Sequence, residues 1–315
     1  MMDPLSDIVS MVTVDAAVTS RLETSGRWGL RFAAVPYAKF GVVHRGECWI
    51  AAPSHPPVRL AAGDCYLFTA GGQYTMASAA DTPAESMEDA EARYAADAVD
   101  GWLRLGGAED VPDVVVTGGR FVLNADHAAL LLDLLPPVLA ISAGSQSAPA
   151  LRAAMDLLVA ETAAGAPQPG GDLVRTHLAH IVVTMALRAY ATGPDVRGWL
   201  AALGDPQLGP VLRAVHQDPA HPWTVQELAQ RAHLARSTFA ARFREHVGVA
   251  PLEYLLRLRM HHAVGLLRRP DASVTEVAEQ VGYASHSSFS HAFTRVMGAP
   301  PGRFRSTTST HIVSR

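Results

Sequence analysis

The stretch Val225-Gln-Glu-Leu-Ala-Gln-Arg-Ala232 recurs 49 residues later as Val274-Thr-Glu-Val-Ala-Glu-Gln-Val281. The match then continues at an offset of 50, because the second copy carries one extra residue in the turn that follows. The positions repeated there are Ser237, Phe239, Phe243, Gly248 and Pro251, which correspond to Ser287, Phe289, Phe293, Gly298 and Pro301. A repeat of this length indicates two copies of one structural unit in the last hundred residues.

Each copy has the pattern of a short helix, a tight turn and a second helix, which is a helix-turn-helix. In the first copy, Thr224 is the expected N-cap of the short helix, residues 233–235 form the turn, and Ser237 caps or opens the second helix. Apolar residues at helical spacing give each helix a buried face. These faces consist of Val225, Leu228, Ala229 and Ala232 in the short helix, and of Phe239, Phe243 and Val247 in the second.

The second copy repeats this pattern around residues 282–284, which form its turn. Ser285 can cap the second helix of this copy, and Phe289 and Phe293 anchor it. Between the copies, Pro251 stands at the first turn of a helix that would fix their separation.

The outward face of each second helix is polar and basic, opposite the aromatic anchors. Such a face suits a helix that enters the major groove of DNA, where base edges offer hydrogen-bond donors and acceptors. The outward face carries Arg236, Thr238, Arg242 and Arg244 in the first copy, and His286, Ser287, Ser288, His291 and Arg295 in the second, and these are candidates for DNA contact.

The two parts of the chain differ in charge, as expected for a protein with a separate DNA-binding module. Residues 211–315 contain 13 arginines and 7 acidic residues, a balance of +6, whereas residues 1–210 contain 13 basic and 23 acidic residues, a balance of −10. The net charge of −4 therefore hides a basic module on an acidic body.

Residues 223–305 resemble the DNA-binding domain of the AraC/XylS family, through Gly282-Tyr283, Ser288-Phe289-Ser290, Phe293 and the closing Gly298-Ala-Pro-Pro-Gly-Arg-Phe304. The resemblance implies that each second helix enters its own major-groove segment on one face of DNA. It also implies that Ser237, Thr238 and Ala241 in the first copy, and His286, Ser287 and His291 in the second, occupy base-reading positions. Ala241 departs from the long polar side chain often found there, and it offers only an apolar contact.

The first part of the chain predicts a β domain. From about residue 21 to 123, short apolar runs alternate with turn signals such as Gly71-Gly72 and Gly118-Gly119, which is typical of an antiparallel barrel or sandwich. An acidic stretch over residues 83–100 interrupts it as a helix or a mobile insertion. Trp28-Gly-Leu-Arg-Phe32 and Val42-Val-His-Arg-Gly46 resemble a cupin-type barrel found as the N-terminal module in one branch of the family.

Helical periodicity replaces the strand pattern from residue 126 onward. One predicted helix has its apolar face at Leu151, Ala154, Met155, Leu158 and Val159, and another at Leu178, Ile181, Val182 and Met185. These helices either pair two subunits or pack on their own barrel. We therefore expect an α+β chain: a cupin-like antiparallel β-barrel (1–125), a helical linker and dimerisation segment (126–209), an all-α double helix-turn-helix domain (210–306) and a tail (307–315).

A small-molecule pocket in the barrel is the expected sensing site. Its candidate lining residues are Trp28, Arg31, His44, Trp49, Tyr66 and Phe68. A metal-dependent enzyme is the alternative, because cupins often hold a metal, and His44 and Glu47 would be its first ligands. Tyr74 stands where the family pattern would place another histidine, which favours an interior, hydrogen-bonded His44 and no metal. Cys48 and Cys65 are either small core residues or, if their strands are neighbours, a redox pair.

The sequence thus predicts a transcription regulator that binds double-stranded DNA and responds to a small-molecule effector, with no catalytic residues, metal or cofactor. An effector-independent DNA-binding protein is the second alternative. A homodimer is the expected assembly and RNA polymerase a further candidate partner. No secretory signal or membrane-spanning run stands out, so the expected location is the cytoplasm.

Overall fold

The computed structural model describes residues 3–11, 14–34, 38–53, 55–69, 72–93, 102–105, 111–123, 135–163, 169–193, 196, 198–269 and 271–305. The chain divides into two compact units. The helical unit comprises residues 1–13, 125–134 and 197–315, and the β unit comprises residues 14–124 and 135–196. These limits differ from the expected domain boundaries after residues 125 and 209, because the helical unit begins at Arg197 and also contains the first residues of the chain.

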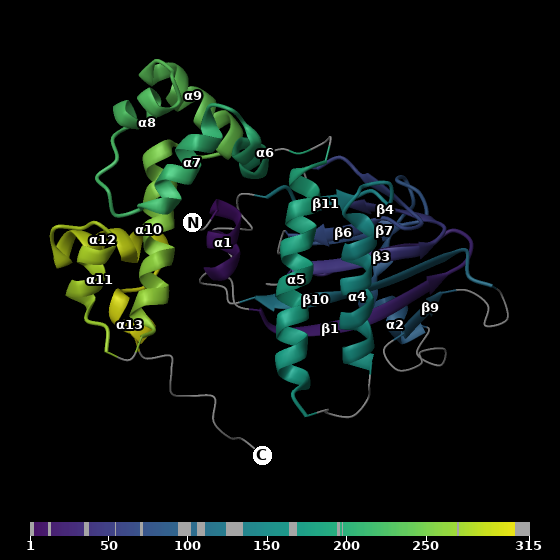
Figure 1. Cartoon of the computed structure of the whole chain (residues 1–315). Helices are drawn as coiled ribbons and strands as arrows, with labels where there is room; N and C mark the ends of the chain where they lie inside the picture. Colours follow the sequence, from purple (N-terminus) through teal and green to yellow (C-terminus); the bar gives the residue numbers. More distant parts are fainter. Residues whose placement is uncertain are drawn as a thin grey trace. The chain divides into compact units, whose positions relative to one another are not determined.

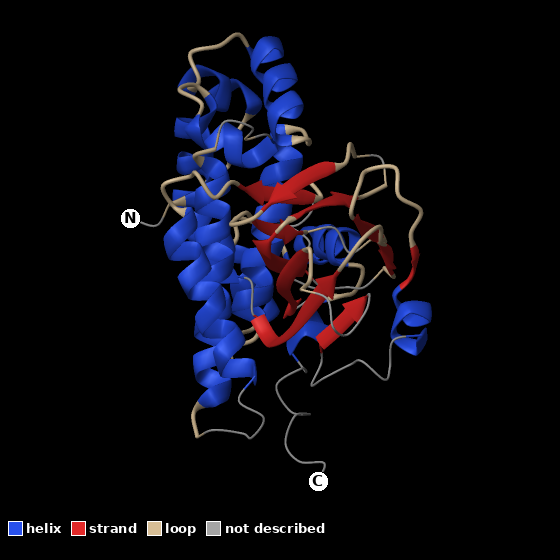
Figure 2. Ribbon diagram, turned by 90° about the vertical axis from the view of Figure 1, so that its right-hand side faces the viewer, coloured by secondary structure: helices blue, strands red, loops and turns tan. Residues whose placement is uncertain are grey.

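The β unit contains two sheets (Figure 2). The six-stranded sheet has the order β11-β6-β3-β10-β1-β9, and the five-stranded sheet the order β5-β4-β7-β2-β8. The strands are β1 (Val14–Thr24), β2 (Gly29–Phe32), β3 (Ala38–Arg45), β4 (Glu47–Ala51), β5 (Val58–Ala61), β6 (Cys65–Phe68), β7 (Tyr74–Ala77), β8 (Glu85–Ser86), β9 (Trp102–Leu105), β10 (Val114–Leu123) and β11 (Val138–Ile141). The expected cupin-like β domain is confirmed: the described strands form two sheets whose pairings are antiparallel, except that β9 and β8 pair in parallel with β1 and β2.

Within the described residues, three helices accompany the sheets. The acidic stretch contains a short helix, α2 (Met87–Arg93). Helices α4 (Ala148–Ala163) and α5 (Gly171–Ala191) run side by side across strands of the six-stranded sheet (Figure 1). The buried face of α5 differs from the predicted one, because Ile181 is 45% exposed whereas Ala179, Val183 and Leu187 are buried. Both helices thus pack on their own sheet, and Ile181 points away from it.

The helical unit contains both copies of the repeat (Figure 1). Its helices are α1 (Pro4–Met11), α6 (Gly198–Gly204), α7 (Leu208–Gln217), α8 (Val225–Arg231), α9 (Arg236–Val247), α10 (Pro251–Leu267), α11 (Val274–Gln280), α12 (His286–Met297) and α13 (Pro301–Arg305). The pair α8–α9 is the first helix-turn-helix, α11–α12 is the second, and α10 packs against helices of both.

Local chemistry explains where these helices begin and end. Thr224 and Ser285 accept hydrogen bonds from backbone N–H groups at the starts of α8 and α12, so both predicted caps are confirmed. Ser237 lies in the first turn of α9 and does not cap it, because α9 begins at Arg236. Gly248 and Gly298 end α9 and α12 with φ of 89° and 71°, a left-handed conformation that favours glycine. The repeated Gly-x-x-Pro is therefore a helix stop followed by a helix start.

Candidate DNA-binding interface

Helix α9 separates a buried aromatic face from an exposed polar one. Phe239 and Phe243 are buried, with their ring centroids 5.6 Å apart. The candidate DNA-contacting residues on the exposed face are Arg236, Ser237, Thr238 and Ala241. The exposure of these four side chains leaves them free to contact DNA.

Arg242 has a different environment from its neighbours on α9. Its Nη2 lies 2.7 Å from Oδ2 of Asp205, in the turn between α6 and α7. Asp205 also accepts hydrogen bonds from the backbone N–H groups of Gln207 and Leu208, at 2.8 and 2.9 Å. Burial raises the pKa of Asp205, but these hydrogen bonds and the guanidinium outweigh it and lower that pKa. Arg242 thus fastens α9 to the start of α7, a role that the sequence did not indicate.

Helix α12 presents the second polar face. Phe289 and Phe293 are buried, and the ring of Phe293 lies 5.1 Å from that of Phe304, between centroids. The residues predicted to face DNA are all exposed: His286, Ser287, Ser288, His291 and Arg295. Ser285 Oγ donates to Ser288 Oγ at 2.9 Å while it accepts from the Ser288 backbone N–H, so Ser288 also shapes the helix start.

A chain of buried hydrogen bonds supports the first copy from behind. Trp199 Nε1 donates to Tyr254 Oη at 2.8 Å, and Tyr254 Oη lies 2.6 Å from His216 Nε2. His216 Nδ1 lies 2.5 Å from Oδ2 of Asp7, on α1. Every hydrogen in this chain has an acceptor if His216 is neutral, with its proton on Nδ1 and Tyr254 donating to Nε2. The first helix of the chain therefore completes the core of the last unit.

The pKa values in this network agree with a neutral histidine facing a charged carboxylate. Burial lowers the pKa of His216, against the opposing effect of Asp7. For Asp7, burial alone would raise the pKa, but the hydrogen bonds from His216 and His262 outweigh it and lower the pKa to about 2. Asp7 is only 2% exposed, so its charge depends on these two partners.

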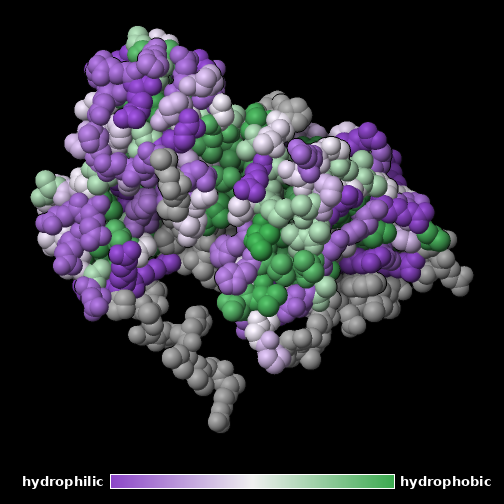
Figure 3. Space-filling view, viewed as in Figure 1, coloured by the Kyte–Doolittle hydropathy of each residue, from purple (hydrophilic) through white to green (hydrophobic). Residues whose placement is uncertain are grey.

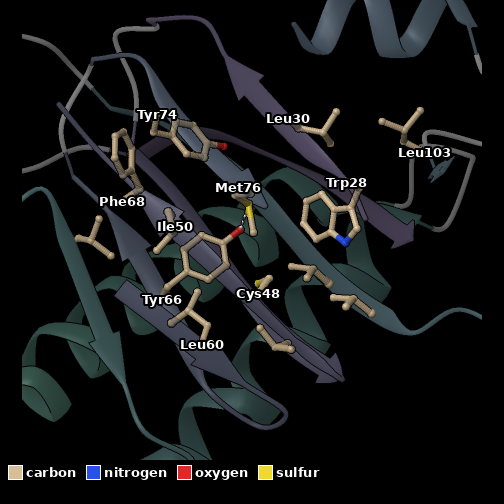
Figure 4. Close-up of a cluster of buried hydrophobic side chains, with 14 of the residues drawn as sticks. Trp28, Leu30, Cys48, Ile50, Leu60, Tyr66, Phe68, Tyr74, Met76 and Leu103 are labelled. Carbon is tan, nitrogen blue, oxygen red and sulfur yellow. Dashed lines mark hydrogen bonds between the residues drawn. The ribbon is translucent and has the colours of Figure 1, made fainter. Parts of the chain in front are cut away.

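Between the two sheets of the β unit lies an apolar cluster that contains three of the six predicted pocket residues (Figure 4). Trp28, Tyr66 and Phe68 belong to it, together with Tyr74 and Met76. Trp28 is 6% exposed, and its Nε1 has no hydrogen-bond partner among the described residues. Tyr66 Oη lies 3.8 Å from Met76 Sδ, which is a weak acceptor. Among the described residues, the buried Trp28 Nε1–H therefore has no acceptor, and the buried Tyr66 hydroxyl has only a weak one.

The other three predicted pocket residues do not line this interior. Successive side chains of a strand point to opposite faces, and Leu30, Val43, Cys48 and Ile50 occupy the interior positions. Arg31, His44 and Trp49 lie between or beside them and therefore point outward; Arg31 and His44 are exposed and Trp49 is half-buried. The expectation of an interior His44 is wrong for this reason. The strand alternation could have identified Leu30, Cys48 and Met76 instead.

Cys48 and Cys65 lie in different sheets, on β4 and β6, and both are buried free thiols. Burial raises the pKa of each thiol to about 12, with smaller effects from nearby charges. Thiolates, which are the reactive form, are therefore scarce at neutral pH. This favours the interpretation as small core residues over a redox pair.

No three His, Cys, Asp or Glu side chains within the described ranges gather closely enough to hold a metal ion. Within the same ranges, no helix is long and apolar enough to cross a membrane.

Comparison with known proteins gives matches for both parts of the chain. Residues 3–192 match the cupin family, and residues 228–307 match a helix-turn-helix domain. An AraC-like transcription regulator of Streptomyces antibioticus is 39% identical over 308 residues, which cover 96% of this chain and 98% of that protein. A second AraC-like transcription regulator, from Streptomyces lividans, is 38% identical with the same coverage. The RCS-specific transcriptional activator RclR of Escherichia coli is 34% identical over 206 residues, which cover 64% of this chain and 71% of that protein.

Proposed function

The chain belongs to the AraC-like family of transcription regulators with an N-terminal cupin domain, and on this premise we propose that it reads two neighbouring segments of double-stranded DNA through α9 and α12. The proposal depends mainly on one observation: α9 and α12 each have an exposed polar face, and the aromatic side chains on the opposite face are buried in the helical unit. Major-groove recognition requires such helices, because base edges are read there by hydrogen bonds and apolar contacts.

The two copies contribute unequally to base reading in this proposal. His286, Ser287 and His291 on α12 can hydrogen-bond to base edges, whereas Ala241 on α9 offers only a methyl group. Arg236 and Arg295 lie on the exposed faces and suit phosphate contacts, which position a protein on DNA without reading its sequence. We therefore expect α12 to set most of the sequence preference.

In vitro selection with the purified full chain tests this proposal. A pool of random duplex DNA should yield a consensus with two short conserved segments, and affinity for it should fall steeply as salt rises, because counterions condensed on DNA are released on binding. A random pool after selection, or affinity that does not depend on salt, would contradict DNA reading by these helices.

A small-molecule effector bound by the β unit would regulate this binding. The support is the pair of under-used donors, Trp28 Nε1 and Tyr66 Oη, in the cluster between the sheets. A buried donor without a partner costs about 1–3 kcal/mol, so a ligand that supplies an acceptor there gains binding energy. The test is a thermal-unfolding screen of small carbonyl and carboxylate compounds. A compound that stabilises the native protein should stabilise Trp28→Phe, which lacks the N–H, by less.

The homodimer is proposed through α4 and α5. The exposed side chains Leu157, Leu173, Val174 and Ile181 form an apolar face on these helices, where Figure 3 shows hydrophobic surface. Such a patch can be self-complementary across a two-fold axis, where each copy presents the same residues. Mass measured in solution should give a dimer for the native chain and a monomer for Ile181→Glu. A dimeric Ile181→Glu would locate the interface elsewhere.

One further partner and a location follow from the role in transcription. We propose RNA polymerase as the protein partner of the DNA-bound regulator. We also propose that it acts in the cytoplasm, where bacterial DNA lies. We propose no catalytic activity, since the exposed His44 is poorly placed for a metal site between the sheets.

A further inference from the structure

Arg259, in the middle of α10, binds a loop that precedes the first copy. Its Nε donates to the carbonyl oxygen of Pro219 at 2.6 Å. Its Nη2 donates to the carbonyl oxygens of Ala220 and His221, at 3.1 and 2.8 Å. Three carbonyl groups of one loop therefore converge on one planar guanidinium, whose donors are fixed in a fork. A lysine ammonium could not reproduce this geometry.

This loop is firmly joined to the first helix-turn-helix. Trp223 is buried, and its Nε1 donates to the carbonyl oxygen of Asp218 at 2.9 Å. The backbone N–H of His221 donates to Asp218 Oδ1 at 3.1 Å. Thr224, the N-cap of α8, follows directly. Any movement of the loop relative to α10 therefore moves α8, and with it α9.

The turn of the second helix-turn-helix lies against the same loop. Gly282 has a φ of 83°, and a Cβ built there would overlap the carbonyl group of Ala220. The Arg259 guanidinium carbon lies 5.8 Å from the ring centroid of Tyr283, and that ring lies 5.7 Å from the ring of Phe289, on α12. Arg259 thus contacts the loop of one copy and the turn of the other.

We propose that Arg259 is a positioning residue that sets the distance and rotation between α9 and α12, and thereby the spacing of the two DNA segments read by one chain. The proposal rests on the proposed DNA-reading function and adds to it a determinant of spacing. One base pair changes the separation of two segments by about 3.4 Å and their relative rotation by about 35°. We call the contacts of Arg259 and Gly282 with residues 219–221 the junction. Because three hydrogen bonds and a close backbone contact hold it, the junction should not adapt to a shift of about 3.4 Å combined with a rotation of about 35°, whereas a loosened junction can.

The test uses the full chain and the DNA site obtained by selection, with the spacing between its two segments changed by plus or minus one base pair. The native protein should bind both altered sites roughly tenfold more weakly than the selected one, a loss comparable to that of a mismatched base pair. Arg259→Ala should bind the selected site more weakly, and its discrimination between spacings should fall to about threefold or less. Arg259→Lys should lie between the two proteins.

Two further variants separate positioning from simple stability. Arg257→Ala is the matched control, since Arg257 lies on the same helix but pairs with Glu253 at 3.0 Å, so the native discrimination should persist. Gly282→Ala keeps Arg259 but forces the loop and the turn apart, and it should also lower discrimination. If Arg259→Ala does not fold, Arg259→Lys decides by the same ratio.

Failure of the proposed function and failure of the spacing proposal give different results. A native protein that selects no DNA would overturn the proposed function itself. A native protein that binds its selected site but tolerates altered spacing would overturn only the role of the junction. Folded Arg259→Ala or Arg259→Lys with native discrimination would do the same.

Discussion

The Arg242 guanidinium and the Asp205 carboxylate, 2.7 Å apart, join the reading helix of the first copy to the turn before α7. This pair gives Arg242, one of the residues predicted to contact DNA, a structural partner that its place between Ala241 and Phe243 in the sequence does not indicate. It also defines a contrast with Arg244, which lies on the same helix and is exposed.

Arg242→Ala should therefore lower stability and leave base preference unchanged. We expect a loss of about 1 kcal/mol in the free energy of unfolding, a modest value because the arginine is partly exposed to solvent. Arg244→Ala should leave stability unchanged and, if Arg244 meets a phosphate, reduce the salt dependence of DNA binding by about one unit of slope. Denaturant unfolding and a salt titration of both variants measure this. A changed consensus for Arg242→Ala would show that Arg242 also contributes to base reading.

His291→Ala should weaken binding to the selected site by about 1–3 kcal/mol and relax selectivity at one position. The reason is that the imidazole can hydrogen-bond to a base edge and the methyl group cannot. Gln280→Ala is the control, because Gln280 is exposed on α11, the scaffold helix of the same copy. The measurement is a repeated selection with each variant, and an identical consensus for His291→Ala would remove this residue from base reading.

Acid should destabilise the helical unit in two stages. The native pKa of His216 is lowered, so as pH falls below about 6.5 the unfolded chain binds a proton that the native state resists, and stability decreases. The native pKa of Asp7 is also lowered, to about 2, so its contribution is present above the unfolded value near 3.8 and is lost as pH falls from there toward 2.

His216→Gln should lack the first stage, the loss of stability that begins below about pH 6.5. The variant should be less stable than the native chain at pH 7.5, because the hydrogen bonds to Asp7 and Tyr254 are weakened, but its stability should fall less between pH 7 and pH 5. Denaturant titrations at several pH values measure both slopes. Parallel curves for the two proteins would show that His216 is protonated equally in the folded and unfolded states.

A DNA-binding fragment should require more of the chain than the repeat alone. A fragment from residue 210 lacks Trp199, which is buried and bonded to Tyr254, so we expect it to be less stable than a fragment from residue 197. Both fragments lack Asp7 and should be stabilised by adding a peptide of residues 1–13. Thermal unfolding of the two fragments, with and without the peptide, gives the order. Equal stability of the fragments would show that α6 is dispensable.

The two thiols should be inert in the folded protein. Because burial raises the pKa of Cys48 and Cys65 to about 12, a thiol reagent at pH 8 should label neither until the chain unfolds. Mass spectrometry after labelling with and without denaturant measures this. Rapid labelling of the native chain would revive a redox function.

The repeat made the C-terminal architecture predictable, because both copies carry the same caps, aromatic anchors and glycine stops within short spans of sequence. For the β unit, the sequence predicted the fold class but not which side chains face the interior. Its apolar runs indicated strands, but the face on which Arg31, His44 or Trp49 lies depends on strand pairing, and pairing joins residues far apart in the chain. Long-range partners such as Asp205 for Arg242, or Asp7 for His216, carry no local signal at all.

Helix α1 has a consequence for how the protein is made. Its Asp7 is synthesised before His216, which is added 209 residues later, and Tyr254 is added later still. At typical translation rates of about 5–20 residues per second, roughly 10–40 s pass between the synthesis of α1 and that of the residues it packs against. The helical unit can thus complete its core only when the much earlier segment that contains α1 packs against it. A tag fused directly ahead of Pro4 would therefore disturb a helical unit whose other residues are encoded about 200 codons downstream.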